Sequence, residues 1–311
     1  MNRLQSMLDD YLTMRRALGH KLVLSGRLLQ RFVAFAEHAG ADVITTELAL
    51  NWAMQPVEAQ PAQWANRLGM VRRFARYCSA IDPRTIVPAP DLLPHRYRRP
   101  APYIYRDDQI IHLLQAAQRL PSATGLRSHT YATLFGLYAA TGMRCSEPLQ
   151  LDRDDVDLVQ GVLTVRGAKF GKSRYVPLHP SSQRALQDYT VHRDRLCRVP
   201  GSPSFFLSER GIRLTEWAVR WTFVKLSQEI GLRRPDDSRG PRLHDLRHRL
   251  AITTLLNWYR QDVDVEQRLP ELATYLGHAH VTDTYWYLTA TPELLHHALQ
   301  RVERSERGQP S

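Results

Sequence analysis

A proline-rich, basic segment between Pro83 and Tyr105 limits most strongly how this chain can fold, and its sequence is PRTIVPAPDLLPHRYRRPAPYIY. Proline ends a helix, because its ring clashes with the preceding turn and its nitrogen has no hydrogen to donate. The segment therefore favours extended chain and separates the helix-patterned sequences on its two sides. We predict an N-terminal domain over residues 1–90, a linker over 91–106 and a second domain over 107–311.

The first ninety residues are patterned as four short helices. The first helix carries apolar side chains on one face at helical spacing: Leu4, Met7, Leu8, Tyr11, Leu12 and Met14. Ser25 is expected to cap the second helix, and Thr45 or Thr46 the third, because a hydroxyl oxygen accepts a hydrogen bond from a free N–H group. The fourth helix, over about 62–78, carries a group of arginines: Arg67, Arg72, Arg73 and Arg76. This group is either an ordinary solvated face or a surface that contacts phosphates.

In the second domain, helical patterning at 107–120 and 128–140 gives way to a short β-rich patch. Residues 162–166 (VLTVR) and 173–178 (SRYVPL) are β-branched and partly alternating, and the turn-like GAKFGK lies between them, which predicts a hairpin. Further helices are expected at 181–194, 214–230, 245–260, 265–276, 282–288 and 292–304. The expected fold class is therefore mainly α with one small antiparallel β-sheet.

The charge of the chain indicates its partner. There are 42 Lys and Arg residues against 31 Asp and Glu, which gives a formal net charge of +11 at pH 7. Such a basic chain favours a polyanionic partner. No apolar run approaches the roughly 20 residues that span a bilayer, and the N-terminus has no apolar signal core. We therefore expect a nucleic-acid partner, a cytoplasmic location and no role for a membrane.

The cysteines argue against two kinds of stabilising site. Cys78, Cys145 and Cys197 are the three cysteines of the chain, and they form no C-x-x-C pair. An odd, sparse set of this kind suits a reducing compartment and disfavours a disulfide framework or a structural zinc site.

Three motifs of the second domain supply arginine, histidine and tyrosine. They are ATGMRCSE at 140–147, LHDLRHR at 243–249 and LGHAHVTDTYWYL at 276–288. An arginine guanidinium donates two parallel hydrogen bonds to a phosphate and keeps its charge at working pH. Arg144 and Arg247 meeting on one phosphate would bind it and stabilise the extra charge of a pentacoordinate transition state.

The last of these motifs ends in two tyrosines, Tyr285 and Tyr287, either of which would supply a nucleophile. A tyrosine hydroxyl has an unperturbed pKa of about 10, so it needs a neighbouring histidine or the field of the arginines to lose its proton. Lys169, at the expected tip of the hairpin, suits protonation of the departing oxygen. These residue types together suit attack of a tyrosine hydroxyl on a phosphodiester.

The order of these motifs resembles the tyrosine recombinases, the phage-integrase-like superfamily. The resemblance covers about 107–290, and the helical N-terminus is similar to the core-binding domain of that family. It implies a two-domain architecture, with a helical DNA-binding domain and a mixed α/β catalytic domain. It also implies DNA cleavage through a covalent 3′-phosphotyrosyl link, release of a 5′-hydroxyl and rejoining to a new strand. The phosphoester energy is retained in such a reaction, so neither a metal nor another cofactor is expected.

The resemblance also implies roles for particular residues. Arg144 and Arg247 match the two phosphate-clamping arginines, and Glu147 matches an acidic residue that supports the first of them. His244 matches the histidine of the H-x-x-R motif, a candidate proton acceptor. His278 matches the histidine that contacts the scissile phosphate.

The nucleophile and the acid follow from the same comparison. The family spacing places the nucleophile nine residues after His278, which selects Tyr287 and leaves Tyr285 as the alternative. Counting back from VPL places Lys169 in the catalytic position and leaves Lys172 as the alternative acid. The remaining basic residues expected to contact DNA lie in the linker and the hairpin: Arg96, Arg98, Arg99, Lys172 and Arg174.

A metal enzyme is the main alternative from another class, because His244 and His248 lie four apart with Asp245 between them. Arg247 on the same turn would repel a cation, aspartate is shorter than the usual glutamate base, and a third ligand is not evident. We therefore expect no metal site, and we expect His248 to be a helix-surface or packing residue.

Two further alternatives keep the fold but change the function. They are a type IB topoisomerase and a DNA-binding regulator without catalysis. For the recombinase, we expect double-stranded DNA as substrate and a homotetramer assembled on it, with or without a partner recombinase. An integrase or transposase of a mobile element is the expected type. The helix at 292–304 would pack either on a neighbouring protomer or on its own chain.

Overall fold

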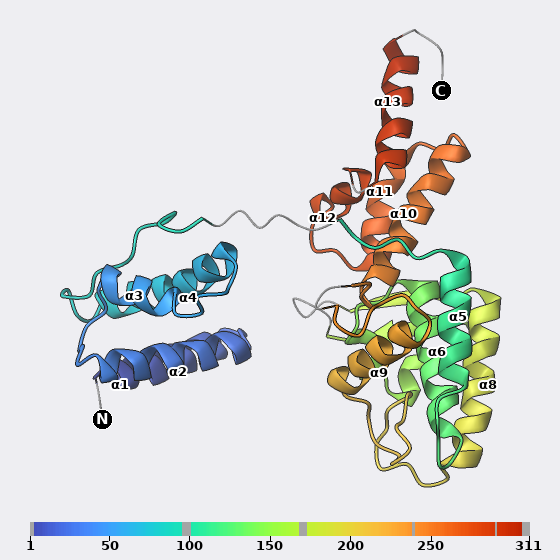
Figure 1. The fold of residues 1–311 in the computed structure, drawn as a ribbon, viewed down its shortest axis with the longest axis horizontal. Coiled ribbons are helices and arrows are strands. Elements are labelled where there is room, and N and C mark those ends of the chain that lie inside the picture. The colour runs from blue at the N-terminus through green and yellow to red at the C-terminus, as the bar shows by residue number, and fades with distance from the viewer. Residues whose placement is uncertain (1–2, 95–100, 168–172, 238–239, 290, 307–311) are drawn as a thin grey trace. The chain divides into compact units, whose positions relative to one another are not determined.

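The computed structural model describes residues 3–94, 101–167, 173–237, 240–289 and 291–306. The chain divides into two compact units, Met1–Pro100 and Ala101–Ser311, and each is described by itself. Both units are built mainly of helices, and the second also contains one small antiparallel sheet, so the predicted fold class is confirmed (Figure 1). Among the described helices, none is long and apolar enough to cross a membrane.

The first unit contains four helices: α1 (Arg3–Ala17), α2 (Val23–His38), α3 (Thr46–Ala53) and α4 (Pro61–Ser79). The prediction of a hydroxyl cap on α3 is confirmed, since Thr45 Oγ1 accepts a hydrogen bond from the Leu48 N–H at 3.1 Å. The prediction that Ser25 caps α2 is wrong. That helix begins earlier, because the Gly26 N–H already donates to the Leu22 carbonyl at 2.8 Å, which places Ser25 inside the first turn.

Apolar faces of these helices enclose one core. Phe32 of α2 and Trp52 of α3 are buried there with their rings edge to face, 5.4 Å between centroids. Phe74 of α4 is buried in the same core and packs against Tyr11 of α1. The apolar face predicted for α1 is buried except at Met14, which lies near the end of the helix and is 42% exposed.

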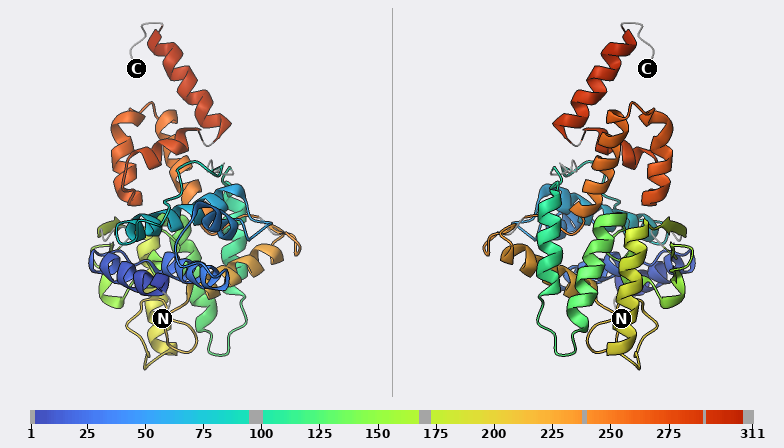
Figure 2. Two further views of the ribbon diagram at one scale, coloured as in Figure 1. Left: turned by 90° about the vertical axis from the view of Figure 1, so that its left-hand side faces the viewer. Right: turned by 90° about the vertical axis from the view of Figure 1, so that its right-hand side faces the viewer.

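Three long helices form the base of the second unit: α5 (Asp107–Gln118), α6 (Leu126–Thr141) and α8 (Pro180–Leu196). They lie side by side, and α6 contacts both of the others (Figures 1 and 2). Leu134 and Phe135 of α6 are fully buried in the large core that this packing creates. Helix α9 (Glu216–Glu229) packs on α5, and Phe223 of α9 meets Phe135 edge to face.

The sheet consists of β1 (Val156–Asp157), β2 (Val162–Val165) and β3 (Arg174–Pro177), hydrogen-bonded in that order and antiparallel. Leu163 pairs with Val176, and both are buried, so one face of the sheet belongs to the core. The predicted hairpin strands are confirmed. Three short elements were not predicted: β1, α7 (Glu147–Gln150) and the 3-10 turn η1 (Arg153–Asp155).

A second core of this unit lies among the last helices: α10 (Asp245–Arg260), α11 (Val265–Leu276), α12 (Thr282–Tyr285), the 3-10 turn η3 (Trp286–Thr289) and α13 (Pro292–Glu306). Leu255, Leu269, Tyr287 and Leu294 are buried in it. The helix expected over 282–288 is divided into α12 and η3. Tyr287 lies in η3 and is buried.

Candidate active site

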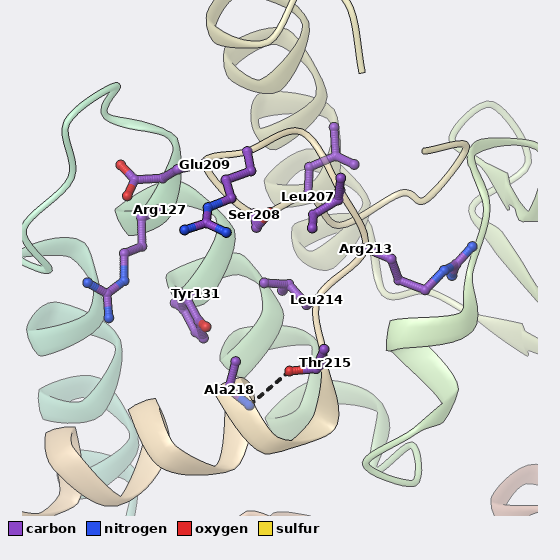
Figure 3. A pocket seen from close by; sticks show the side chains of 11 residues that line it. Arg127, Tyr131, Leu207, Ser208, Glu209, Arg213, Leu214, Thr215 and Ala218 are labelled. Carbon is purple, nitrogen blue, oxygen red and sulfur yellow. Dashed lines mark hydrogen bonds between the residues drawn. The ribbon is translucent and has the colours of Figure 1, made fainter. Parts of the chain in front are cut away.

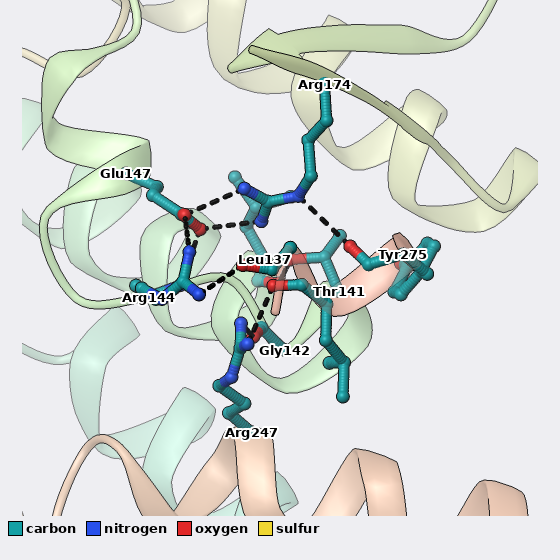
Figure 4. A network of polar contacts seen from close by, with 10 residues as sticks. Leu137, Thr141, Gly142, Arg144, Glu147, Arg174, Arg247 and Tyr275 are labelled. Carbon is teal, nitrogen blue, oxygen red and sulfur yellow. Dashed lines mark hydrogen bonds and ion pairs between the residues drawn. The ribbon is translucent and has the colours of Figure 1, made fainter. Parts of the chain in front are cut away.

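The site forms where the end of α6 meets the first turns of α10. Gly142 ends α6 in the left-handed conformation, with φ at 59°. The left-handed backbone favours glycine, and a Cβ at this position would also lie 2.7 Å from Leu250 Cδ2, so that side chain would have to move. The Gly142 carbonyl accepts a hydrogen bond from Arg247 Nη1 at 2.9 Å (Figure 4).

Arg247 is a buried cation that joins three elements. Its side chain is 2% exposed, and Nη2 donates to the Leu276 carbonyl at the end of α11, at 2.7 Å. Burial lowers the pKa of Arg247 to about 10, so the guanidinium stays protonated at neutral pH. The ends of α6 and α11 are thus held around one positive charge on α10.

Arg144 leaves the turn after Gly142 and is held by Glu147. Its backbone N–H donates to Glu147 Oε2 at 2.7 Å, and its Nη1 donates to Oε1 at 2.9 Å. Its Nη2 donates to the carbonyl of Gly277. The expectation that Glu147 supports this arginine agrees with these contacts, and Figure 4 shows the two side chains facing each other.

Arg174 approaches the same carboxylate from β3. Its Nη1 and Nη2 donate to the two oxygens of Glu147, each at 2.8 Å, and its Nε donates to the Tyr275 carbonyl at 3.0 Å. Burial opposes the charge of Glu147, but Arg174 and then Arg144 outweigh it, so the pKa of this carboxyl is held below its usual value. Arg174 was expected to contact DNA, and the structure instead places its guanidinium in an internal ion pair.

The guanidinium groups of Arg144 and Arg174 both bind the Glu147 carboxylate, and the buried guanidinium of Arg247 lies near enough to interact with it electrostatically. This network therefore holds three cations and one carboxylate. The excess of positive charge suits an anionic ligand. A cavity of about 350 Å³ adjoins it, and Arg144, Glu147, Asp155 and Arg166 are among the residues that line it. A phosphate that entered this cavity would meet the network directly.

Three histidines lie near the arginines. His244 precedes α10, and His248 follows it one turn later with the ring centroids 4.8 Å apart. His278 follows Gly277, which ends α11 in the left-handed conformation, and its Nδ1 lies 2.7 Å from Thr284 Oγ1. Burial, followed by neighbouring cationic or imidazole groups, lowers the pKa of each histidine to about 4. All three imidazoles are therefore neutral at neutral pH.

Tyr287 completes this cluster. Its side chain is only 2% exposed, its hydroxyl oxygen lies 3.1 Å from His248 Nδ1, and its ring is stacked parallel to that of His278 at 6.2 Å. Tyr285, by contrast, is 47% exposed. The structure thus brings the selected tyrosine to the histidines and turns the alternative tyrosine toward solvent.

His248 was expected to be a helix-surface or packing residue, and its ring does pack against Trp286 and Tyr287. Its contact with the Tyr287 hydroxyl was not predicted. One signal in the sequence could have identified it: His248 follows His244 by four residues, so both lie on one face of α10. Lys169 and Lys172, the two candidate acids, lie outside the described residues.

The basic residues of the first unit differ in their surroundings. Arg67 stacks 3.8 Å over the Trp52 ring and donates to the Trp52 carbonyl at 2.8 Å, and Arg72 donates to the carbonyls of Pro88 and Ala89 at 2.9 Å each. Two neighbours on α4, Arg73 and Arg76, are exposed. The linker arginines expected to contact DNA lie outside the described residues: Arg96, Arg98 and Arg99.

A second cavity and a metal site are the two features that would indicate a competing site. A separate cavity of about 310 Å³ lies between the start of α6, the 207–215 segment and α9, and none of the predicted site residues lines it (Figure 3). In the described parts of the chain, no group of three or more His, Cys, Asp or Glu side chains is arranged to hold a metal ion.

Known proteins share this sequence and fold. Residues 104–293 match the phage integrase family. A Sinorhizobium fredii protein described as the integrase/recombinase y4rB is 48% identical over 308 residues, which is 98% of each chain. Tyrosine recombinase XerC of Chlamydia caviae is 29% identical over 232 residues, covering 73% of this chain and 67% of that protein.

Two solved structures show the same fold at low sequence identity. The Tn1549 transposon integrase in complex with transposon right end DNA has a TM-score of 0.66 at 16% identity, covering 97% of this chain and 100% of that one. A lambda integrase tetramer bound to a Holliday junction has a TM-score of 0.58 at 20% identity, covering 90% and 78%. Together with the match over 104–293 and the close relative, these findings show that the chain belongs to the phage integrase family of tyrosine recombinases, enzymes of DNA recombination that break and rejoin DNA strands.

Proposed function

We propose that this chain is an integrase or transposase of a mobile element that cleaves double-stranded DNA with Tyr287. Tyr287 Oη attacks a backbone phosphorus and forms a 3′-phosphotyrosyl link, while the bond to the 5′ oxygen breaks and leaves a 5′-hydroxyl. The 5′-hydroxyl of another strand then attacks the link and releases the tyrosine. The observation that carries the proposal is the burial of the Tyr287 hydroxyl among neutral imidazoles beside the arginine network.

Arg144 and Arg247 are proposed to clamp the phosphate that Tyr287 attacks. Each guanidinium carries five N–H donors, so an arginine can hold main-chain carbonyls and phosphate oxygens at once. The carbonyl contacts fix the direction of both side chains before DNA arrives, which is the preorganisation that stabilises developing charge most effectively. Glu147 is proposed to keep Arg144 in this orientation.

His278 and the hairpin lysine are proposed to complete the reaction. Because His278 Nδ1 is occupied by Thr284, its Nε2 is the atom proposed to contact the scissile phosphate. Lys169 is proposed as the acid that protonates the departing 5′ oxygen, with Lys172 as the alternative. The cavity beside Arg144 is bordered by Arg166 and Gly167, and Gly167 comes two residues before Lys169 in the sequence.

Affinity for DNA is proposed to come largely from phosphate contacts outside this site. The residues 1–90 are proposed as a DNA-binding domain, and Arg73 and Arg76 are its exposed cations on α4. Cationic contacts release counterions from DNA, so binding should weaken steeply as salt rises. The linker arginines would add further phosphate contacts of this kind.

A tetramer on DNA is the proposed working unit, with or without a partner recombinase. The beginning of α13 packs in its own chain, since Leu294 is fully buried. Two other apolar residues of the same helix are exposed, Leu295 at 43% and Leu299 at 60%. We propose that this second face of α13 packs on a neighbouring protomer, because an amphipathic helix stabilises an assembly by covering its apolar side.

A nicked duplex tests the function directly. The protein is incubated without metal on duplexes that carry the end sequence of its element and a nick near the cleavage site, and SDS-resistant adducts are counted. Wild type and the matched control Tyr285→Phe should form the adduct, and Tyr287→Phe should bind the DNA without forming it. An adduct that requires zinc or magnesium would overturn the mechanism. Relaxed plasmid without any recombinant product would indicate a topoisomerase instead.

A further inference from the structure

The Tyr287 hydroxyl must lose a proton when it attacks, and the side chain that it contacts is His248. His248 lies on α10 directly after Arg247, and its Nδ1 is 3.1 Å from the Tyr287 hydroxyl oxygen, which is a hydrogen-bonding distance. Trp286 packs against the same imidazole with 5.3 Å between ring centroids. The tyrosine is 2% exposed, so bulk water has little access to its hydroxyl.

A proton acceptor for a tyrosine nucleophile must lie within hydrogen-bonding distance of the hydroxyl, and it must itself be unprotonated. His248 has the geometry, because its nitrogen already touches the oxygen that would lose the proton. His244, the acceptor that the family motif suggests, directly precedes α10, with its ring edge to face against His248. The hydrogen bond thus favours the second of the two histidines.

His248 also has the right charge to accept a proton. Burial lowers its pKa to about 4, so the ring is neutral at neutral pH and one of its nitrogens carries a lone pair. Asp245, itself 1% exposed, raises this pKa, while His244, Arg242 and Arg247 lower it. A bound DNA phosphate would oppose those positive charges and make the imidazole more basic when the substrate is present.

We infer that His248 accepts the proton of Tyr287 as the nucleophile attacks, an inference that rests on the proposed function. The bond between Tyr287 Oη and phosphorus forms as the bond from phosphorus to the 5′ oxygen breaks. The hydroxyl proton passes to His248 Nδ1, and the departing 5′ oxygen takes its proton from the proposed acid, Lys169. In the rejoining step both protons move back, so the cycle consumes none.

Two substitutions separate proton transfer from positioning. In His248→Asn a polar atom of the amide reaches the place of Nδ1 and can hold the hydroxyl, but it cannot take up a proton. In His248→Ala both abilities are lost. The matched control is His112→Asn, a substitution at an exposed position on α5. Thermal melts should be recorded for all three proteins, so that loss of fold is separated from loss of rate.

The assay is single-turnover cleavage of a nicked duplex across a pH range. Both His248 variants should cleave about 10²- to 10⁴-fold more slowly than wild type at pH 7, the usual effect of losing a general base. Their rates should rise about tenfold per pH unit, because the reaction then depends on the small fraction of tyrosine hydroxyl that is already deprotonated, and this fraction grows about tenfold per unit while most of the hydroxyl is protonated. The wild-type and His112→Asn rates should change far less over the same range.

A second substrate distinguishes the base from the acid. A duplex with sulfur in place of the bridging 5′ oxygen has a leaving group that needs no proton, so a variant of the acid recovers on it. The His248 variants should remain slow. Restoration of the wild-type rate and pH profile in His248→Asn would show that His248 only positions the hydroxyl. A steep pH profile in His244→Asn, with a shallow one in His248→Asn, would assign the proton to His244.

Failure of the inference can be told from failure of the proposed function on the same gel. If wild type forms no adduct that depends on Tyr287, the proposed function is wrong. If wild type forms that adduct and both His248 variants cleave at the wild-type rate, only the role of His248 is wrong.

Discussion

The shared carboxylate of Glu147 gives the sharpest prediction about stability. The substitution Glu147→Gln keeps the size of the side chain but removes its charge and replaces one acceptor oxygen by an amide donor. Each carboxylate oxygen accepts one hydrogen bond from Arg144 and one from Arg174, four in total, at 2.7 to 2.9 Å. The new amide nitrogen would therefore face N–H donors. Removing one partner of a buried ion pair costs about 3–5 kcal/mol, so we expect a loss of that size in the free energy of unfolding.

Urea unfolding monitored by circular dichroism measures this loss, with Glu216→Gln as the matched control. Glu216 pairs with Arg220 on the surface of α9, where both side chains are well exposed. An exposed pair of this kind contributes at most about 1 kcal/mol. The account would be refuted if Glu147→Gln lowered stability no more than Glu216→Gln does.

Lowering the pH should remove the same charge, because it protonates the Glu147 carboxylate. The folded-state pKa of Glu147 is depressed below the ordinary value of 4.5, so its contribution is present above that pH and is lost as pH falls through the folded pKa. The stability difference between wild type and Glu147→Gln should therefore shrink in acid below about pH 4.5. A difference that stayed constant between pH 7 and pH 3 would contradict the assignment of charge.

Three further predictions concern packing, DNA binding and assembly. Gly142→Ala should lower the free energy of unfolding by at least about 1–2 kcal/mol for the left-handed backbone, and by more than Gly231→Ala, where a Cβ meets nothing within 4 Å; equal losses in urea would contradict the close approach to the Leu250 side chain. Arg73→Ala and Arg76→Ala should each reduce the salt dependence of DNA binding by about one ion, whereas Arg67→Ala should chiefly lower the melting temperature because it stacks on Trp52; an unchanged salt slope, measured by titration, would remove these residues from the interface. Leu299→Asp should reduce the mass of the protein–DNA complex without changing cleavage by single protomers, and a full-sized complex would show that α13 does not assemble the tetramer.

Local patterns were enough to predict most elements of the fold. Apolar spacing predicted the helices, and the β-branched runs predicted β2 and β3 as the two strands of a hairpin. The short elements were missed because two to four residues show no periodicity. The start of α2 was misplaced because a main-chain hydrogen bond to Leu22, rather than a side-chain cap, decides it.

The site was predictable where a residue acts through its position in a motif, and less so where its role depends on a distant partner. Arg144, Arg247, His278 and Tyr287 meet as their motifs suggest. Arg174 of the hairpin was expected to contact DNA, together with the other basic residues of the hairpin and the linker. Its ion pair with Glu147 joins residues 27 apart in the chain, and only the folded arrangement of β3 and α7 creates it.

The central claim is that Tyr287 becomes covalently bound to DNA, and mass spectrometry of the trapped adduct tests it most directly. Trypsin should release residues 269–301 as one peptide, which contains Tyr275, Tyr285 and Tyr287 together. After nuclease digestion, fragmentation of this peptide identifies the tyrosine that carries the 3′-phosphonucleotide. The account predicts the modification on Tyr287 alone, and a nucleotide on Tyr285 or Tyr275 would contradict it.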